Sequence, residues 1–335
     1  MSLRRLIPQL YSGPGWNGPA GDHFDGRMFF NPGLPGPRGF REVVRWKLTG
    51  HPERWPKRVD DGVRASFPER AGPGELAITA VGHATFLIQI NGLNLLTDPV
   101  WSERASPFRW IGPRRVRRPG IAWERLPRID AVLISHSHYD HLDLPTLRDL
   151  HGRFDPLLVT GLGNGGLLAS RELTRSTGLD WWQKTTLADG AAAVTFVPAR
   201  HWSNRGDGRH NTTLWGGFVI EGGGRRAYFA GDTGWFSGFA AIRERCGAPD
   251  IALLPIGAYE PRWFHSTMHM NPEEAVRAHL ATGARQSLGC HFGVWQLTDE
   301  GIDAPIHALA AARKKCGVSA DAFRTPGFGE TVFAG

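Results

Sequence analysis

Residues 131–143 have the sequence AVLISHSHYDHLD, and this stretch decides how the rest of the chain is interpreted. Its first four residues are apolar and partly β-branched, which is typical of a short buried strand. His136, His138, Asp140 and His141 follow where that strand ends. Imidazole and carboxylate are ligands that zinc, iron and manganese bind, and no cysteine lies nearby to form a thiolate site. The stretch therefore predicts a catalytic metal site, in which His136 and His138 turn to one ion and Asp140 and His141 to a second.

Two catalytic ions that keep a position open for water need about six ligands, so further ligands must come from later in the chain. His201, Asp232 and His291 each follow a predicted strand. Strand ends at one edge of a sheet can converge, so these three residues are the candidates that complete the set. Taken alone, any one of them is equally compatible with a core or turn residue.

The rest of the chain alternates short apolar runs with turns and helical patterns. Glycine- and proline-rich turns separate the runs, which favours strands in a largely buried sheet. Strands are predicted at residues 76–81, 86–90, 93–96, 131–135, 194–198, 214–221, 226–230, 251–255 and 286–290. Helices are predicted at residues 39–48, 144–150, 272–281 and 302–316, with Asp143 as the N-terminal cap of the second.

Length and composition limit the organisation of the chain. At 335 residues with 41% hydrophobic residues, it can close as one α/β unit with a large core. Residues 1–70 are rich in Gly, Pro and Arg, so we expect an extension packed on a main domain of residues 71–335. The three cysteines have no paired spacing, and neither a signal sequence nor a membrane-spanning run is found. We therefore expect a cytoplasmic protein without a transmembrane segment.

The net charge of +7 favours anionic partners. The excess is concentrated in Arg114-Arg115-Val116-Arg117-Arg118. This run is either a solvated loop between two prolines or a patch for lipid headgroups and phosphorylated substrates, including peripheral contact with an anionic membrane. No recognition helix or basic-aromatic module accompanies it, so nucleic acid is not an expected partner.

The histidine loop and several later motifs resemble those of a known family. The loop is similar to the first metal-binding loop of the metallo-β-lactamase superfamily of two-metal hydrolases. Seven other motifs resemble the branch that contains the phospholipases D that hydrolyse N-acyl-phosphatidylethanolamine, and they are Gly82-His83-Ala84-Thr85, Leu96-Thr97-Asp98-Pro99, Arg104-Ala105-Ser106-Pro107, His201-Trp202, Gly231-Asp232-Thr233-Gly234, Gly257-Ala258-Tyr259-Glu260-Pro261-Arg262-Trp263 and Asn271-Pro272-Glu273-Glu274-Ala275. The resemblance runs from about residue 75 to the C-terminus and does not cover the N-terminal extension.

The resemblance implies a fold, a ligand set and a chemistry. The fold is an α/β four-layer αββα sandwich with two divalent metal ions, zinc first and iron or manganese as alternatives. In the implied set, one ion is held by His136, His138 and His201. The other is held by Asp140, His141 and His291, and Asp232 bridges the two. Asp140 and His269 are the implied catalytic residues, with His269 on the rim of the site.

Several residues beside these motifs have two open interpretations. Asp98 is either an acceptor for a ligand histidine or a plain Asp-Pro turn, and His83 belongs either to loop architecture or to support of the site. Asp143 is interpreted mainly as a helix cap. Trp202, Trp263 and Trp295 are expected to line an apolar entrance.

The predicted function is that of a binuclear metal-dependent hydrolase, most simply a phospholipase D-like phosphodiesterase that acts on a small-molecule or lipid phosphodiester through a metal-bridging hydroxide. A lactonase or another carbonyl hydrolase would use the same ligands. A metal-binding sensor without turnover is less compatible, because structural sites tend to be closed.

Overall fold

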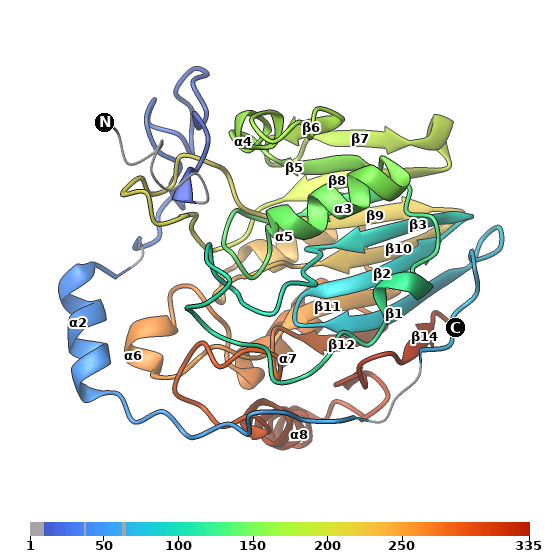
Figure 1. Cartoon of the computed structure of the whole chain (residues 1–335). Coiled ribbons are helices and arrows are strands. Elements are labelled where there is room, and N and C mark those ends of the chain that lie inside the picture. The colour runs from blue at the N-terminus through green and yellow to red at the C-terminus, as the bar shows by residue number, and fades with distance from the viewer. Residues whose placement is uncertain (1–9, 37, 62–64) are drawn as a thin grey trace.

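The computed structural model describes residues 10–36, 38–61 and 65–335, and Figure 1 shows their arrangement. Most strands of this part of the chain lie in two sheets of seven strands each, ordered β14-β1-β2-β3-β4-β5-β6 and β13-β12-β11-β10-β9-β8-β7. The first sheet contains β1 (Leu76–Gly82), β2 (Thr85–Ile90), β3 (Leu93–Thr97), β4 (Ala131–Ile134), β5 (Leu157–Gly161), β6 (Ser176–Leu179) and β14 (Thr331–Phe333). The second contains β7 (Lys184–Leu187), β8 (Ala192–Val197), β9 (Gly217–Gly222), β10 (Arg225–Phe229), β11 (Ile251–Pro255), β12 (Gln286–Cys290) and β13 (Phe323–Arg324).

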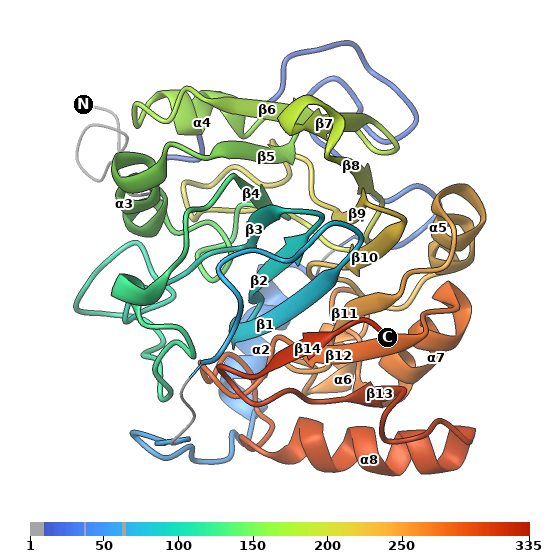
Figure 2. The same cartoon turned by 90° about the vertical axis from the view of Figure 1, so that its right-hand side faces the viewer.

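The helices of the described ranges are α2 (Phe40–Thr49), α3 (Leu144–Phe154), α4 (Gly165–Ala169), α5 (Gly238–Cys246), α6 (Arg262–His265), α7 (Pro272–Thr282) and α8 (Ala304–Cys316), with short 3₁₀ turns at Trp123–Arg125 and Ala188–Gly190. Helices α3, α5, α7 and α8 cover the outer faces of the two sheets, whereas α2 and α6 lie away from them. Figure 2 shows α3 on one side of the sheets and α5 and α7 on the other.

The alternation of side chains along the strands explains this layering. Successive residues of a strand point to opposite faces, so a strand covered on both sides is apolar throughout. In β3, Leu95 belongs to the core between the sheets, and Leu96 packs with Leu147 of α3. In β11, Leu253 faces the same central core, whereas Leu254 packs beneath α7. The four-layer αββα sandwich predicted from the resemblance is thereby confirmed.

Strand direction brings one set of strand ends together in each sheet. In the first sheet β3 is parallel to β4 and antiparallel to β2, so β1, β3 and β4 run in one direction. In the second sheet β8, β10 and β12 share a direction for the same reason. The carboxyl ends of these six strands carry the residues of the candidate site.

Most predicted elements are present, with corrections at their ends and among short strands. β9 begins at Gly217, not at residue 214, because Leu214 and Gly216 donate their N–H groups to Leu162 and Ser135 of the other sheet. The sequence prediction lacks the strands β5, β6, β7, β13 and β14 and the helices α4, α5 and α6. Asp143 stands at the N-cap of α3, but its carboxylate accepts from the Thr146 hydroxyl at 2.6 Å and makes no capping bond to the backbone.

The described part of residues 1–70 packs along the main domain. The indole N–H of Trp46 donates to Asp299 at 3.0 Å, and that of Trp55 donates to the Glu300 carbonyl at 2.9 Å. The division into an extension and a main domain remains a prediction. No helix of the described ranges is long and apolar enough to cross a membrane.

The arginine run is only partly solvated, in contrast to the solvated loop that is one of its two sequence interpretations. Arg115 is buried and donates to the carbonyls of Ser102 and Val100 at 3.0 and 2.8 Å. Arg117 donates to Asp61 and to the Gly293 carbonyl. Arg114 is exposed and pairs with the exposed Glu103 at 3.4 Å. Two of the four arginines therefore hold loops to the core.

This difference predicts unequal effects on stability. Arg115→Ala would leave two buried carbonyls without their donor, so it should lower the free energy of unfolding by about 2 kcal/mol. Arg114→Ala removes an exposed ion pair and should change it by less than about 0.5 kcal/mol. Urea unfolding of both variants measures the difference, and equal effects would contradict the structural role of Arg115.

Candidate metal centre

All seven predicted ligands come from loops at the carboxyl ends of the strands named above. The loop after β4 provides His136, His138, Asp140 and His141, and the loops after β8, β10 and β12 provide His201, Asp232 and His291. Each strand is fixed by its ladder of backbone hydrogen bonds, so each loop starts from a rigid point. Two sheets thus converge on one cluster.

The carboxylate of Asp232 lies at the centre of this cluster. Its Oδ2 atom is 3.1 Å from His291 Nε2 and 3.2 Å from His141 Nε2. The same oxygen is 3.7 Å from His201 Nε2 and 3.9 Å from His136 Nε2. Its other oxygen, Oδ1, has no hydrogen-bond partner among the described residues. One carboxylate oxygen therefore faces the imidazoles of four predicted ligands.

Three histidines form a group on one side of Asp232. His138 Nδ1 lies 2.8 Å from His136 Nε2 and 3.3 Å from His201 Nε2. A neutral imidazole has one N–H and one lone pair, so three ring nitrogens aimed at one another cannot all be satisfied by shared protons. A divalent cation is the partner that accepts several such lone pairs at once.

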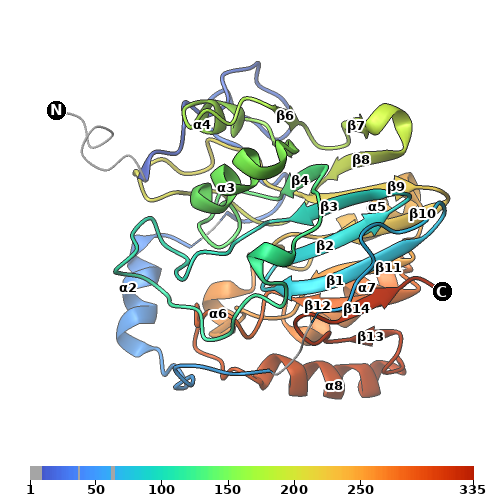
Figure 3. The same ribbon diagram turned by 45° about the vertical axis from the view of Figure 1, so that its right-hand side comes forward.

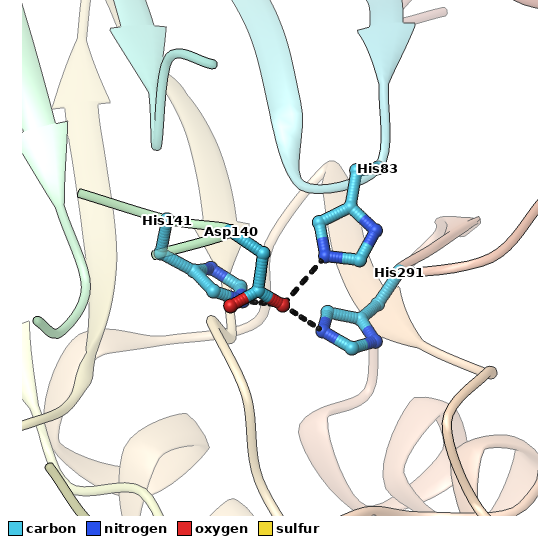
Figure 4. Close-up of side chains that lie close together, drawn as sticks. All are labelled: His83, Asp140, His141 and His291. Carbon is cyan, nitrogen blue, oxygen red and sulfur yellow. Dashed lines mark hydrogen bonds and ion pairs between the residues drawn. The ribbon is translucent and has the colours of Figure 1, made fainter. Parts of the chain in front are cut away.

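The second group lies on the other side and is drawn in Figure 4. Asp140 Oδ2 is 3.4 Å from the Nε2 atoms of both His141 and His291. Tetrahedral ligands at zinc bond lengths near 2.0–2.1 Å are about 3.4 Å apart, so this spacing fits an ion. His83, in the turn between β1 and β2, reaches the same oxygen at 3.0 Å, and its ring lies 4.0 Å from that of His291.

Burial and neighbouring charges set the protonation of these groups. Burial lowers the pKa of His138 to about 3 and that of His201 to about 4, which favours neutral rings. Burial also acts to lower the pKa of His291, but Asp232 and Asp140 outweigh it and raise this pKa to about 9. The same carboxylates hold the pKa of His141 well above its usual value. Because metal ligation needs neutral imidazole, a bound cation would replace these protons.

Unpartnered buried atoms provide a further test of whether the residues fit metal ions. Among the described residues, the buried side-chain atoms without a hydrogen-bond partner include His138 Nε2, His141 Nε2, His291 Nε2, Asp232 Oδ1 and His269 Nδ1. Buried polar atoms are normally satisfied. Four of these five residues belong to the predicted ligand set, so the donor chemistry fits divalent ions.

Two buried polar residues outside the predicted ligand set, Asp98 and Arg205, hold the histidine loop in place. Asp98 lies 2.6 Å from His141 Nδ1, and it accepts from the backbone N–H and the hydroxyl of Ser135 at 2.7 and 2.6 Å. Of its two sequence interpretations, the structure supports the acceptor. The buried guanidinium of Arg205 donates to the carbonyls of Ser137 and Leu142 at 2.8 and 3.0 Å. Sequence reasoning missed Arg205, because its surroundings, Asn204-Arg205-Gly206-Asp207, resemble an ordinary polar turn.

His269 lies beside both groups but outside them. Its Nδ1 atom is 3.9 Å from Asp232 Oδ2, and its ring is 5.1 Å from that of His201. Arg262 donates to the His269 carbonyl at 2.9 Å and to Glu274 at 2.7 Å. Arg262 therefore anchors the loop that presents His269.

The three tryptophans expected at an entrance differ in position. Trp202 contacts the His138 ring at 4.8 Å, and Trp263 is 37% exposed. Trp295 is buried, with its ring centroid 4.8 Å from that of His83 and the Arg115 guanidinium over its face. Trp295 is thus part of the support under His83, and its expected place at the entrance is wrong.

Comparison with known families gives one match that covers more than half of the chain. The family described as "Beta-lactamase superfamily domain" matches residues 93–292. These limits span the strands from β3 to β12 and the loops with all seven predicted ligands.

Two relatives illustrate the range of similar proteins. An uncharacterised protein of Mycobacterium tuberculosis is 42% identical over 248 residues, which cover 72% of this chain and 65% of that protein. The N-acyl-phosphatidylethanolamine-hydrolyzing phospholipase D 1 of Caenorhabditis elegans is 40% identical over 232 residues, which cover 66% of this chain and 65% of that protein. The similarity thus spans slightly less than two thirds of either relative.

Solved structures share the fold. Igni18, a metallo hydrolase from the archaeon Ignicoccus hospitalis, has a TM-score of 0.57 at 22% identity and covers 77% of this chain and 98% of its own. An isothiocyanate hydrolase from Delia radicum gut bacteria has a TM-score of 0.58 at 22% identity and covers 76% and 98%. With the fold, the convergent ligands and the family match in agreement, this chain belongs to the metallo-β-lactamase superfamily of metal-dependent hydrolases and resembles its N-acyl-phosphatidylethanolamine-hydrolysing phospholipase D branch.

Proposed function

We propose that the protein is a binuclear hydrolase of phosphodiesters. In this proposal His136, His138 and His201 hold one divalent ion, and Asp140, His141 and His291 hold the other. The observation that carries the proposal is the position of Asp232, whose Oδ2 atom lies between 3.1 and 3.9 Å from four ligand histidines, two in each group. We propose zinc as the ion in both positions, because the donors are imidazole and carboxylate.

The metal ions and the side chains have separate tasks. Bound divalent ions supply Lewis acidity at the substrate oxygens and lower the pKa of water. Asp232 and Asp140 offset the charge of the ions. His269 faces Asp232 from outside both groups, so we assign it contact with the leaving oxygen of the substrate. Arg262 holds the backbone of His269 and thereby keeps this ring in place.

Two observations support phosphodiesters over lactones or other carbonyl compounds. The 40% identical C. elegans relative is named for phospholipase D activity, and motifs specific to that branch surround the site. A diester is also an anion in the ground state, which two cations attract. Arg262 gives no support, since its guanidinium is occupied. The free thiols of Cys246, Cys290 and Cys316 are compatible with the cytoplasmic location that we propose.

Metal content gives the first test. The purified protein should carry close to two transition-metal ions per chain by elemental analysis, because the donor set exceeds one tetrahedral centre. Asp232→Ala should reduce occupancy of both sites, and His201→Ala should chiefly empty one. His151→Ala, on the surface of α3, should retain both ions. A constant value near one ion, unchanged by added zinc, would contradict the binuclear arrangement.

His83 should matter for one ion only. Its Nε2 atom lies 3.0 Å from the Asp140 oxygen, so it orients that carboxylate toward the second ion. His83→Ala should weaken binding of that ion by roughly 10- to 100-fold. Cobalt titration followed by absorption spectroscopy measures both affinities in one experiment, and the site of His136, His138 and His201 acts as the internal control. Equal weakening of both sites would indicate a general loss of folding.

Substrate preference gives the test of reaction class. The metal-loaded protein should hydrolyse bis-aryl phosphate with a higher kcat/KM than a lactone or a β-lactam. The activity should require added or bound metal and should be lost in His136→Ala and in Asp140→Ala. Efficient turnover of lactones without turnover of any diester would leave a binuclear carbonyl hydrolase as the function.

A further inference from the structure

Helix α2 carries an apolar stripe that the protein does not cover. Phe40, Val44 and Leu48 are spaced by four residues and so lie along one face of the helix. They are 81%, 39% and 79% exposed, and Phe40 and Leu48 are the two most exposed large hydrophobic side chains of the described ranges. Isolated exposed apolar residues are common, but an aligned row of them on a helix indicates a contact surface.

The opposite side of α2 is firmly attached to the protein. Trp46 is buried, and its ring lies 5.1 Å from that of Phe264 and 4.8 Å from that of His265. Its indole N–H also donates to Asp299 at 3.0 Å. Figure 3 shows α2 beside α6 and away from the two sheets. The contacts of Trp46 thus leave the row of Phe40, Val44 and Leu48 facing outward.

Positive side chains flank this stripe. Arg41, Arg45 and Lys47 are exposed, and Glu42 is the helix's one acidic residue, so the helix carries a net charge of 3 − 1 = +2. The Arg45 guanidinium lies 4.7 Å over the ring of Trp263, which is itself 37% exposed. Apolar side chains bordered by cations and an exposed tryptophan are the features of helices that lie in the headgroup region of a bilayer.

We propose that α2, with Trp263, is a docking surface for an anionic lipid bilayer. This rests on the proposed function, because an enzyme that cleaves lipid phosphodiesters has to reach them at a bilayer. The positive charge of α2 favours a bilayer over a second copy of the chain as the partner that binds this surface. A symmetric pair would place two helices of charge +2 against each other, whereas an anionic surface complements them. The arginine run at residues 114–118 is a weaker candidate, since Arg115 and Arg117 bond to the protein itself.

The docking surface adjoins the metal centre through a short series of contacts. The His265 ring, against which Trp46 packs, lies 5.8 Å from the His269 ring. Trp202 packs against the cluster of Trp46, Phe264 and Met268, and its ring lies 4.8 Å from that of His138. A bilayer seated on α2 is therefore close to the rim of the site.

Vesicle binding by the metal-loaded full chain tests the proposal. The probes are vesicles of phosphatidylglycerol mixed with phosphatidylcholine, and vesicles of phosphatidylcholine alone. The double variant Phe40→Ser/Leu48→Ser should bind the mixed vesicles on the order of tenfold more weakly, because two apolar side chains that would enter the bilayer are lost. The control Leu280→Ser/Phe333→Ser removes a leucine and a phenylalanine that are also exposed, at 51% and 57%, but lie outside α2, and it should bind as the unmodified protein does.

Charge and activity give two more readouts. Arg41→Ser/Arg45→Ser should reduce binding to the mixed vesicles and weaken its salt dependence. All these variants should hydrolyse soluble bis-aryl phosphate at the unmodified rate, because none of the changed residues touches the metal centre. Vesicle binding without any diester hydrolysis would overturn the proposed function and leave the docking surface standing.

Three results would overturn the docking surface. The first is unchanged vesicle binding in the Phe40/Leu48 variant. The second is loss of binding only in Trp110→Ser/Ile111→Ser. These two exposed side chains lie just before the arginine run at residues 114–118, so this result would place the contact there and not on α2. The third is a dimer in sedimentation velocity that Phe40→Ser/Leu48→Ser converts to a monomer, which would make a second copy the occupant. Diester hydrolysis by a protein that binds neither kind of vesicle would also reject the surface while keeping the proposed function.

Discussion

The contact of Asp232 with four imidazoles is the constraint on which the arrangement of this protein depends. Taking a carboxylate out of water costs several kcal/mol unless partners compensate it. Here the histidines outweigh that burial and hold the pKa of Asp232 well below its usual value. The four histidines come from loops after β4, β8 and β12, so no single segment could build the contact. The two sheets have to meet at the right edge before the cluster can exist.

Residues outside the predicted ligand set maintain this geometry. Asp98 fixes the ring of His141, Arg205 ties down two carbonyls of the histidine loop, and Arg115 packs on Trp295, which in turn packs on His83. The interactions of these residues are all directed inward. Some basic residues that the sequence suggests as a patch for anions therefore hold loops of the protein in place. This is why a high net charge alone does not locate a binding surface.

The sequence predicted the central features well because their signals are local. A short apolar run followed by clustered histidines predicts a strand with a metal loop, and β11 and β12 were predicted to the residue because nine of their ten residues are buried. Prediction failed where burial is partial. β7, Lys184–Leu187, exposes two of its four residues, so it lacks an apolar pattern. The inward direction of Arg115 and the anchoring role of Arg262 depend on distant carbonyls, and no local pattern reveals them.

The N-terminal segment illustrates the same limit in a region that the resemblance does not cover. Its composition suggested only a wrapping extension, yet Asn31 donates to the carbonyl of His201, one of the predicted ligands, at 2.8 Å and accepts from the indole of Trp215 at 3.3 Å. Both contacts join positions more than 150 residues apart, at separations of 170 and 184. A buried amide that satisfies a ligand's backbone restricts the loop after β8, because an unpaired buried carbonyl is costly. The segment before the family domain is thus linked to the metal centre at Asn31 and to the rim of the site at Trp46.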